Sequence, residues 1–509
     1  MLFTEPAFLL AFVPLSLLAF WGAARLWGRE AALGVLFAAS CLFYASYGLR
    51  VFALMAAGTV VNGVICLLLV RLDRTRARTR ALLFWSGQAW NFGTLALFKY
   101  LAPLLGAAHG GTDSGIPVGI SFYTFQQAVL LVDAWSHERR VLQYLPAGRP
   151  LAGFARFGAF HTFFPQLVVG PITYLSEFGP QALRQRFGRF NRTDLEVGLA
   201  LIAMGLFKKV VIADSLGRIS GPVFDGLAQG MPANPVQAWL AVTAYFAQLY
   251  FDFSGYSDMA LGLARLFGIR LPFNFDSPLR ASGIADFYRR WHITLTRVIG
   301  RFLFTPLALW GTRTAMRHRL PRLPARALSA WLPMLVNFQV IALWHAALPT
   351  FVLFGLVHGL WFILETEVRA TRAWRRFRGA TNETLRLRLG QALTLLPLML
   401  TFALFRSPSL EVFGALLRAL VPDRPAQMDW TSAAQVAAAF AVIWLAPNSQ
   451  ELLRRYRPGI RTWDNPSTTP MLARLEWRPT LAWGLFTAAL LLSAFALISY
   501  KAPFIYLGY

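Results

Sequence analysis

Long apolar runs, separated by short polar or basic segments, form the dominant pattern of this chain. Many runs extend over roughly 20 residues, the length that an α-helix needs to cross the hydrocarbon core of a bilayer. A transmembrane barrel would instead show alternating segments of about 10 residues. The pattern predicts helices at 7–24, 31–48, 51–71, 81–106, 116–135, 151–175, 194–214, 235–268, 298–311, 326–346, 349–367, 387–405, 408–421, 431–447 and 479–499.

Several of these runs are short or interrupted, so we predict roughly 10 to 13 true crossings plus re-entrant or interfacial helices. The run 235–268 is predicted to be broken, because Ser254 and Gly255 lie in its polar middle. We expect an all-α polytopic membrane protein with one integral domain, 1–509. Its predicted parts are N-terminal helices (1–95), a core that carries the motifs (96–370) and C-terminal helices (371–509).

Composition supports a membrane protein, because 56% of the residues are hydrophobic and only 14% are charged. About a quarter of the residues are charged in ordinary soluble domains. The net charge of +25 does not indicate nucleic-acid binding, since Lys and Arg collect in short loops between spans, as is typical of cytoplasmic loops. Such loops are also suited to anionic membrane lipid, a phosphorylated cofactor or an acidic carrier protein.

The basic loops also predict an orientation. The loop from Arg71 to Arg80 is the most basic and is placed in the cytoplasm. Counting back three spans puts the N-terminus outside. The loop 107–115, which has no Lys or Arg, then lies outside, and the basic loop 136–150 returns inside. The run that starts near Pro6 lacks a basic region before it and a cleavage site after it, so it is interpreted as the first span rather than a signal peptide.

Polar side chains within apolar runs are costly in lipid and usually face a cavity or a partner. They occur in four segments: 163–174, 250–278, 285–307 and 342–365. In the first, prolines interrupt the run, which is either a kinked packing helix or a cavity lining. In the second, Asp252 and Asp258 belong either to a polar helix junction or to a functional cavity. In the third, Asp286 is placed to pair with Arg289 three residues later.

The fourth segment holds two histidines, His345 and His358. Pro349 breaks the run between them, so we expect His345 at the end of one helix and His358 in the middle of the next. Both have intramembrane positions, where an ionisable group is a hypothesis of function by default. A buried histidine is suited to two roles that the residues alone do not separate. It can act as a general base on a hydroxyl, or as part of a proton relay in a transporter.

Other chemistries find no support in the sequence. The two cysteines, Cys41 and Cys66, lie inside apolar spans and provide neither a disulfide framework nor zinc-type spacing. The chain has no Gly-x-Ser-x-Gly elbow, HExxH helix or phosphate-binding loop. No histidine spacing supports a metal site, so we predict none.

Nine short motifs occur in an order that resembles one known family. They are LFKYLAP (97–103), PVGISFYTFQ (117–126) followed by Asp133, FFPQLVVGPI (163–172), GLFKKVVIAD (205–214), FDFSGYSDMALGL (251–263), PFNFDSP (272–278), DFYRRWHITL (286–295), LWHAALPTFVLFGLVHGLW (343–361) and PFIYLGY (503–509). Together they cover most of the chain from about residue 95. The chain resembles the membrane-bound O-acyltransferase superfamily, and within it the bacterial branch similar to alginate O-acetyltransferases.

The resemblance implies transfer of an acyl group from a thioester to a hydroxyl, in a funnel buried among the helices. His345 matches the family's near-invariant histidine in a Leu-Trp-His-Gly pattern and inherits the catalytic role. His292 matches the second polar position of the active site. Arg289, Arg290 and Trp344 are predicted to bind the donor. The resemblance gives His358 a supporting position.

Two features depart from the family pattern. Ala346 stands where the glycine after the histidine is usual, and GRFLFTPLALW (300–310) replaces a run that normally contains an Arg-Asp pair and glycines. Both lie close in sequence to the predicted site residues. We expect these two departures to affect which substrate and partner the protein uses, rather than the acyl-transfer chemistry.

The resulting hypothesis is an enzyme that transfers an acetyl group to hydroxyls of an exported cell-surface polysaccharide, directly or through a partner. The predicted donor is acetyl-CoA or another acyl-CoA, or an acyl-carrier thioester, with no tightly bound cofactor. Predicted partners are a periplasmic SGNH-type acetyltransferase or esterase, or glycan-synthesis proteins, in a bacterial inner membrane. The alternatives are D-alanyl transfer to teichoic acid from a carrier protein and, in a different class, a proton-coupled transporter or flippase.

Overall fold

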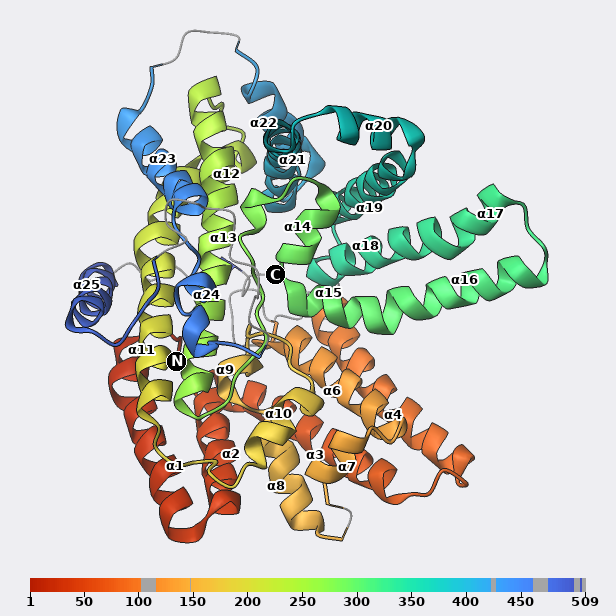
Figure 1. Cartoon of the computed structure of the whole chain (residues 1–509), viewed down its shortest axis with the longest axis vertical. Helices are drawn as coiled ribbons and strands as arrows, with labels where there is room; N and C mark the ends of the chain where they lie inside the picture. Colours follow the sequence, from red (N-terminus) through yellow and green to blue (C-terminus); the bar gives the residue numbers. More distant parts are fainter. Residues whose placement is uncertain (102–115, 147, 423–426, 461–474, 499–503, 506–509) are drawn as a thin grey trace.

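The computed structural model describes residues 1–101, 116–146, 148–422, 427–460, 475–498 and 504–505, and these residues form helices and connecting loops without a β-strand (Figure 1). The predicted outer loop 107–115 lies outside the described residues. The N-terminal helices are η1 (Phe8–Phe12), α1 (Val13–Trp27), α2 (Arg29–Ala45), α3 (Leu49–Arg71), α4 (Ala77–Ala96), η2 (Leu97–Leu101), α6 (Ile120–Trp135), α7 (Arg139–Tyr144), α8 (Pro150–His161), α9 (Phe164–Leu167) and α10 (Leu175–Ala182).

The middle of the chain forms α11 (Arg192–Phe207), η3 (Lys208–Ala213), α12 (Asp214–Ala228), α13 (Pro235–Leu266), η4 (Pro278–Arg280), α14 (Ile284–Arg290), α15 (Ile293–Ile299), η5 (Gly300–Phe304), α16 (Thr305–Arg317), α17 (Arg322–Arg326), η6 (Ala327–Trp331) and α18 (Leu332–His345). The remaining helices are α19 (Pro349–Ala370), α20 (Arg372–Ala380), α21 (Glu383–Arg406), α22 (Leu410–Ala419), α23 (Trp430–Leu445), α24 (Ser449–Leu452), η7 (Arg454–Tyr456) and α25 (Leu481–Leu497).

Six helical segments within the described residues are long and apolar enough to cross a membrane: Phe8–Trp27, Leu49–Arg71, Ile293–Arg317, Arg322–His345, Pro349–Ala370 and Glu383–Arg406. Two shorter apolar helices, Trp430–Leu445 and Leu481–Leu497, add to them. The chain is therefore an all-α, multi-pass membrane protein, as the hydrophobic pattern predicts. The higher total of crossings stays a prediction.

The predicted break in 235–268 is wrong, because α13 is one continuous helix from Pro235 to Leu266. Gly255 serves a different purpose, which is close packing. A Cβ added to Gly255 would lie 2.7 Å from the carbonyl oxygen of Gly205 on α11, and one added to Gly262 would lie 2.6 Å from that of Gly198. Two pairs of glycines thus let the backbones of α11 and α13 touch, as small residues do at helix interfaces in membranes.

The predicted span 151–175 is not one helix. The helix α8 ends at His161, Phe164–Leu167 makes a single turn, and the chain then continues without helix to Tyr174. Pro165 and Pro171 interrupt it, as the sequence indicates. This irregular segment is buried between helices, which is where non-helical backbone is tolerated at membrane depth.

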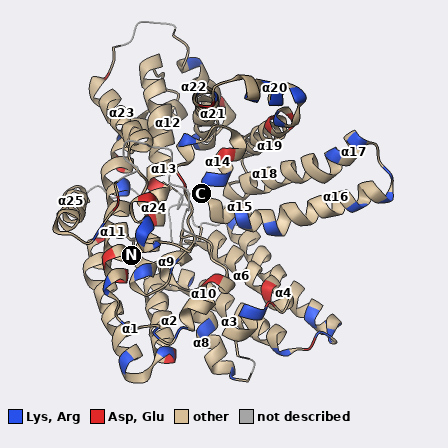
Figure 2. Ribbon diagram, in the orientation of Figure 1, with Lys and Arg blue, Asp and Glu red and all other residues tan. Residues whose placement is uncertain are grey.

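The helices α16 and α18 form a long hairpin that projects from the body, and α17 lies at its far end (Figure 1). Its base carries the two predicted histidines, since His292 precedes α15 and His345 ends α18. Arginines gather at its tip, as Figure 2 shows. The fold thus places His292 and His345 at the base of the hairpin, where its two arms join the body of the molecule.

Candidate functional site

His345 is the last residue of α18, and its surroundings are aromatic. The next residue, Ala346, is extended, with φ −159° and ψ 151°, and Pro349 starts α19. The imidazole is buried, 4.6 Å from the Trp344 ring and 5.0 Å from the Phe405 ring between centroids. The predicted separation of His345 and His358 onto two helices is therefore confirmed.

His292 lies in the sharp connection between α14 and α15 and has a left-handed backbone, with φ 43° and ψ 51°. This conformation is uncommon for a residue other than glycine and persists only where the surroundings enforce it. Here Asn274 holds the two residues that follow His292. The Ile293 N–H donates to the Asn274 carbonyl at 2.9 Å, and the Thr294 hydroxyl donates to the Asn274 amide oxygen at 2.6 Å.

The two histidines belong to one centre. The Phe122 ring lies 6.3 Å from the His292 ring and 5.8 Å from the Trp344 ring, so it bridges the two sides. Lys99 joins them, because its Nζ lies 5.3 Å from the centroid of the Trp344 ring. We call this group, Lys99, Phe122, His292, Trp344 and His345, the histidine centre.

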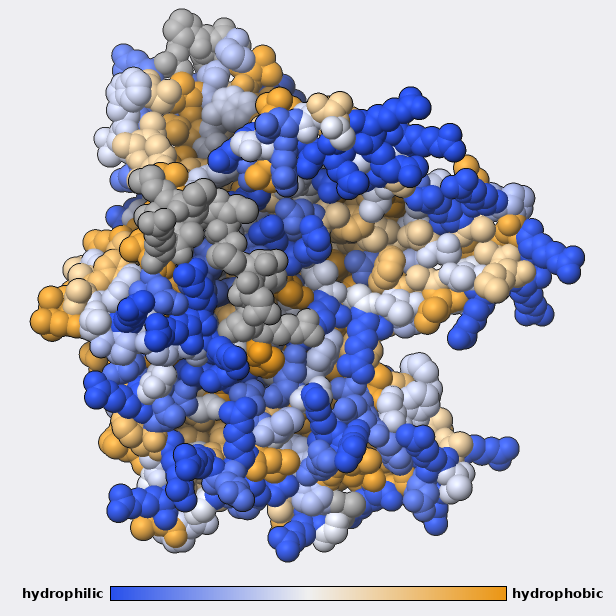
Figure 3. Space-filling view, in the orientation of Figure 1, coloured by the Kyte–Doolittle hydropathy of each residue, from blue (hydrophilic) through white to orange (hydrophobic). Residues whose placement is uncertain are grey.

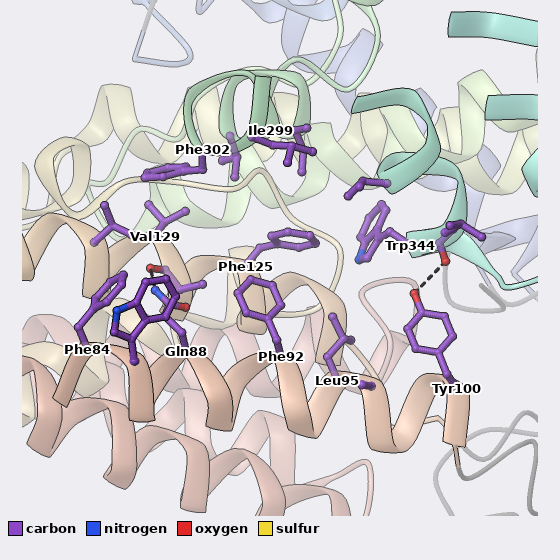
Figure 4. Close-up of a pocket in the computed structure, with 18 residues that line it drawn as sticks. Phe84, Gln88, Phe92, Leu95, Tyr100, Phe125, Val129, Ile299, Phe302 and Trp344 are labelled. Atoms are coloured by element: carbon purple, nitrogen blue, oxygen red, sulfur yellow. Dashed lines mark hydrogen bonds between the residues drawn. The ribbon is translucent and has the colours of Figure 1, made fainter. Parts of the chain in front are cut away.

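An apolar cavity of about 540 Å³ borders Trp344 (Figure 4). In the close-up, Phe84, Phe92 and Leu95 of α4 point into it from one side, and Ile299 and Phe302 from the other. The Tyr100 hydroxyl donates to the Leu343 carbonyl at 2.8 Å and fixes the end of α18 beside it. Its lining is almost wholly apolar, which suits an apolar group rather than a charged one.

Lys99 is a residue that the sequence reasoning missed. Its side chain is buried, with Nζ 3.5 Å from the Ser121 hydroxyl and 5.3 Å from the centroid of the Trp344 ring. Within the described ranges, no carboxylate lies within ion-pair distance of it. The signal was present, since Lys99 is the one charged residue of LFKYLAP, and a charge within an apolar run is a functional hypothesis.

Asn274 and Thr294 were also missed as positioning residues for His292. Thr294 accepts the Ile172 N–H at 3.1 Å, which ties His292 to the buried irregular segment after α9. Asn274 in turn donates to the Ser257 hydroxyl of α13 at 3.2 Å. Neither residue has a local sequence signal for this role, because their partners are 17 to 122 positions away.

Arg289 and Arg290 lie at the end of α14, and both pair with Asp286 at 2.9 Å. The predicted pairing of Asp286 with Arg289 is thus confirmed. Burial opposes ionisation of Asp286, but the two guanidinium groups hold its pKa below the ordinary value. Arg290 also reaches Asp276 at 3.4 Å, whereas the Arg289 side chain is 75% exposed. Arg289 is the better placed of the two to meet an anion.

His358 lies apart from the histidine centre, in the middle of α19. Its Nδ1 is 2.7 Å from the Tyr288 hydroxyl of α14, and its ring stacks on Phe354 at 4.1 Å. The rings of Phe354 and Phe405 intervene between it and His345. This geometry agrees with a supporting position, and the role itself stays a prediction.

A second buried polar group joins η3, α12 and α13. Lys209 lies 2.7 Å from both Asp214 and Asp252, and Lys208 lies 2.6 Å from Asp258. These five residues form the lysine–aspartate cluster. A π-helical turn, Lys208–Ala213, carries the two lysines. The uncertainty over Asp252 and Asp258 is resolved in part, since both carboxylates have opposite charges beside them. In the part of the chain that the structure describes, no three His, Cys, Asp or Glu side chains gather to hold a metal.

Comparison with known proteins adds to this geometry. The model of the family described as MBOAT, the membrane-bound O-acyltransferase family, matches residues 117–393. A peptidoglycan O-acetyltransferase of Helicobacter pylori is 31% identical over 446 residues, 83% of this chain and 80% of that protein. A probable alginate O-acetylase AlgI of Pseudomonas putida is 29% identical in an alignment of 541 positions, which covers 99% of this chain and 99% of that protein. A teichoic acid D-alanyltransferase of Bacillus subtilis is 26% identical over 248 residues, 48% of this chain and 57% of that protein.

Proposed function

Since the chain belongs to the membrane-bound O-acyltransferase family and is a multi-pass membrane O-acyltransferase, we propose that it acetylates hydroxyls of an exported cell-surface polysaccharide. The proposed donor is a cytoplasmic thioester, either acetyl-CoA or an acetylated carrier. The proposed location is a bacterial inner membrane, with the N-terminus on the periplasmic side. The acetyl group reaches the glycan directly or through a periplasmic partner of the SGNH acetyltransferase type.

One observation carries the proposal. His345 closes α18 inside an aromatic enclosure that also holds His292, in a chain whose O-acetyltransferase relatives match over most of its length. D-alanyl transfer is the weaker candidate, because two D-alanyltransferase relatives match only 52% and 48% of the chain.

The proposed chemistry uses His345 as the general base. The hydroxyl oxygen of the acceptor attacks the thioester carbonyl carbon while His345 takes the hydroxyl proton. The carbonyl oxygen becomes negatively charged, and His292 or the Lys99 ammonium stabilises it across the centre. The carbon–sulfur bond then breaks, and His345 returns its proton to the thiolate. The products are the acetyl ester and the free thiol.

The donor's anionic part has a separate place in this proposal. Arg289 extends from α14 on the same short segment that holds His292. An exposed guanidinium is suited to a phosphate of coenzyme A or to an acidic carrier. Trp344 contributes an aromatic wall beside the reacting thioester.

The test is acetyl transfer from radiolabelled acetyl-CoA, or from an acetylated carrier, into envelope glycan by membranes that contain the protein. We expect His345→Ala to lower the transfer rate at least 100-fold at equal protein level, the range for loss of general-base catalysis. Wild-type transfer rates in His345→Ala would refute the assigned base. Transfer of D-alanine rather than acetate would favour the weaker candidate, and transport without any transfer would indicate a transporter or flippase.

A further inference from the structure

A second cavity, of about 510 Å³, lies at the far end of α19 and α21 from His345. Half of its lining residues are arginines or aromatic residues: Arg369, Trp374, Arg375, Phe377, Arg378 and Arg386. None of these residues belongs to the histidine centre. Figure 2 shows the basic residues around α20, and Figure 3 shows a hydrophilic surface over the same part of the molecule.

The cavity lies at the adjoining ends of two apolar helices. Both Pro349–Ala370 and Glu383–Arg406 are long and apolar enough to span, and the short helix α20 connects them. Trp374 and Phe377 are three residues apart on α20, so they share one face of the helix. Tryptophan and arginine together at the end of a span are typical of the headgroup level of a bilayer.

The cavity carries excess positive charge. Arg369 forms an ion pair with Glu365 at 3.1 Å and donates a hydrogen bond to the Ser282 carbonyl at 3.0 Å. Arg386 donates to the Arg378 carbonyl at 3.0 Å, which orients it without neutralising it. Among the described residues, the lining has one carboxylate, Glu383, for the three remaining guanidinium groups. The cavity therefore has a net positive charge that is complementary to an anionic group.

Apolar side chains continue from this charged cavity along α21. Leu389 and Leu393 line its edge, and Leu396 follows one turn further. They are spaced as neighbours on one helix face, and they are 46%, 73% and 48% exposed. A soluble anion would use the arginines alone, whereas a ligand with a phosphate and a hydrocarbon chain would use both surfaces.

We propose that this cavity binds an anionic phospholipid. The phosphate contacts Arg375, Arg378 and Arg386, and an acyl chain lies along the leucines of α21. The site is joined to α14, because the Ser282 carbonyl is held by Arg369 and the Ile284 N–H donates to Glu365 at 2.6 Å. Bound lipid thereby steadies the start of the helix that leads to His292. Binding is independent of the proposed function, and only this effect on α14 rests on it.

The test measures lipid binding to the purified full-length protein in zwitterionic detergent. Phosphatidylglycerol is titrated and detected by native mass spectrometry, with phosphatidylcholine, inorganic phosphate and coenzyme A as separate probes. We expect phosphatidylglycerol to bind, and the double variant Arg375→Gln, Arg378→Gln to weaken its apparent affinity roughly tenfold or more, given the attraction of each arginine to anionic lipid. Leu393→Ser is expected to weaken phosphatidylglycerol and leave inorganic phosphate unaffected.

The matched control is the double variant Arg317→Gln, Arg322→Gln at the tip of the α16–α18 hairpin. It removes two exposed arginines that do not line the cavity. It is expected to bind phosphatidylglycerol as the wild type does. Equal weakening in the control would overturn the site, because it would show a general charge effect. Inorganic phosphate or coenzyme A that competes fully at the lipid's own concentration would also overturn it, in favour of a soluble anion. Thermal unfolding in lipid-free detergent verifies that each variant is folded, and none of these readouts depends on transfer activity.

Discussion

The lysine–aspartate cluster and the histidine centre are both buried among helices, but they differ in what surrounds their charged groups. In the cluster, Lys209 lies 2.7 Å from each of two carboxylates. In the histidine centre, aromatic rings form the walls, and the described residues bring no carboxylate to Lys99. A matched charge is satisfied without any ligand and serves the fold. A charge enclosed by rings is still able to respond to a substrate.

The largest effect is expected from removing Lys209, which tests whether the lysine–aspartate cluster stabilises the fold. Lys209→Met would leave Asp214 and Asp252 buried without their shared cation, and we expect a loss of about 3–5 kcal/mol in the free energy of unfolding. Asp252→Asn is the matched control, because it keeps the pair between Lys209 and Asp214. It is expected to cost about 1.5–3 kcal/mol, the range for a hydrogen bond to a charged group. Denaturant unfolding in detergent measures both, and equal losses would contradict the assignment of Lys209 as the central charge.

Removing Lys99 tests whether the charge of the histidine centre contributes to acetyl transfer. Lys99→Met is expected to lower the acetyl-transfer rate about 100-fold, the range for one donor to a developing oxyanion. The free energy of unfolding should not fall, since no buried carboxylate loses its partner. Initial rates and unfolding are measured on the same preparation, with Lys99→Arg as the variant that keeps the charge. A stability loss as large as that of Lys209→Met would erase the distinction between the two regions.

The support beneath His292 allows a finer test. Thr294→Val removes the hydroxyl that donates to Asn274 and accepts from the Ile172 N–H, and we expect a roughly tenfold lower kcat with KM nearly unchanged. Thr294→Ser keeps the hydroxyl and should restore most of the rate. If KM rose in parallel with the fall in kcat, Thr294 would belong to binding rather than to the positioning of His292.

The smallest effect is expected beside His345. Ala346 has φ −159°, an extended conformation that does not need glycine. Ala346→Gly should therefore change the transfer rate by less than about twofold, because alanine already adopts this backbone conformation without strain. A large gain in rate, measured at equal protein level, would show that the methyl group obstructs the substrate.

The sequence predicted well what depends on local pattern. Apolar runs of sufficient length predicted the six long apolar helices, and Pro349 separated His345 from His358 because proline cannot continue a helix. Asp286 and Arg289 are three residues apart, so a helix alone brings them together. The family motifs then gave the O-acyltransferase assignment, which the match over 117–393 confirms.

The sequence predicted poorly what depends on distant partners. Gly255 was interpreted as a break because glycine weakens helices, but Gly205, fifty positions earlier, uses its missing side chain for packing. Asn274 was not recognised because its role exists only once Thr294 lies beside it. The contact between His292 and Trp344, the neighbour of His345, likewise runs through Phe122 of a third helix, which no local pattern indicates.

Tyr256 of α13 is enclosed by residues from both ends of the chain, and this affects the order of biogenesis. Its ring stacks on Phe3 at 4.8 Å and meets Phe504 edge-on at 4.7 Å, while the Ile505 N–H donates to Asp252 at 3.0 Å. A ribosome adds about 5–20 residues per second. Roughly 10 to 50 s therefore separate the synthesis of Asp252 from that of its last partner. During that interval the newly inserted α13 depends on Lys209, made before it, to keep the Asp252 carboxylate from facing lipid alone.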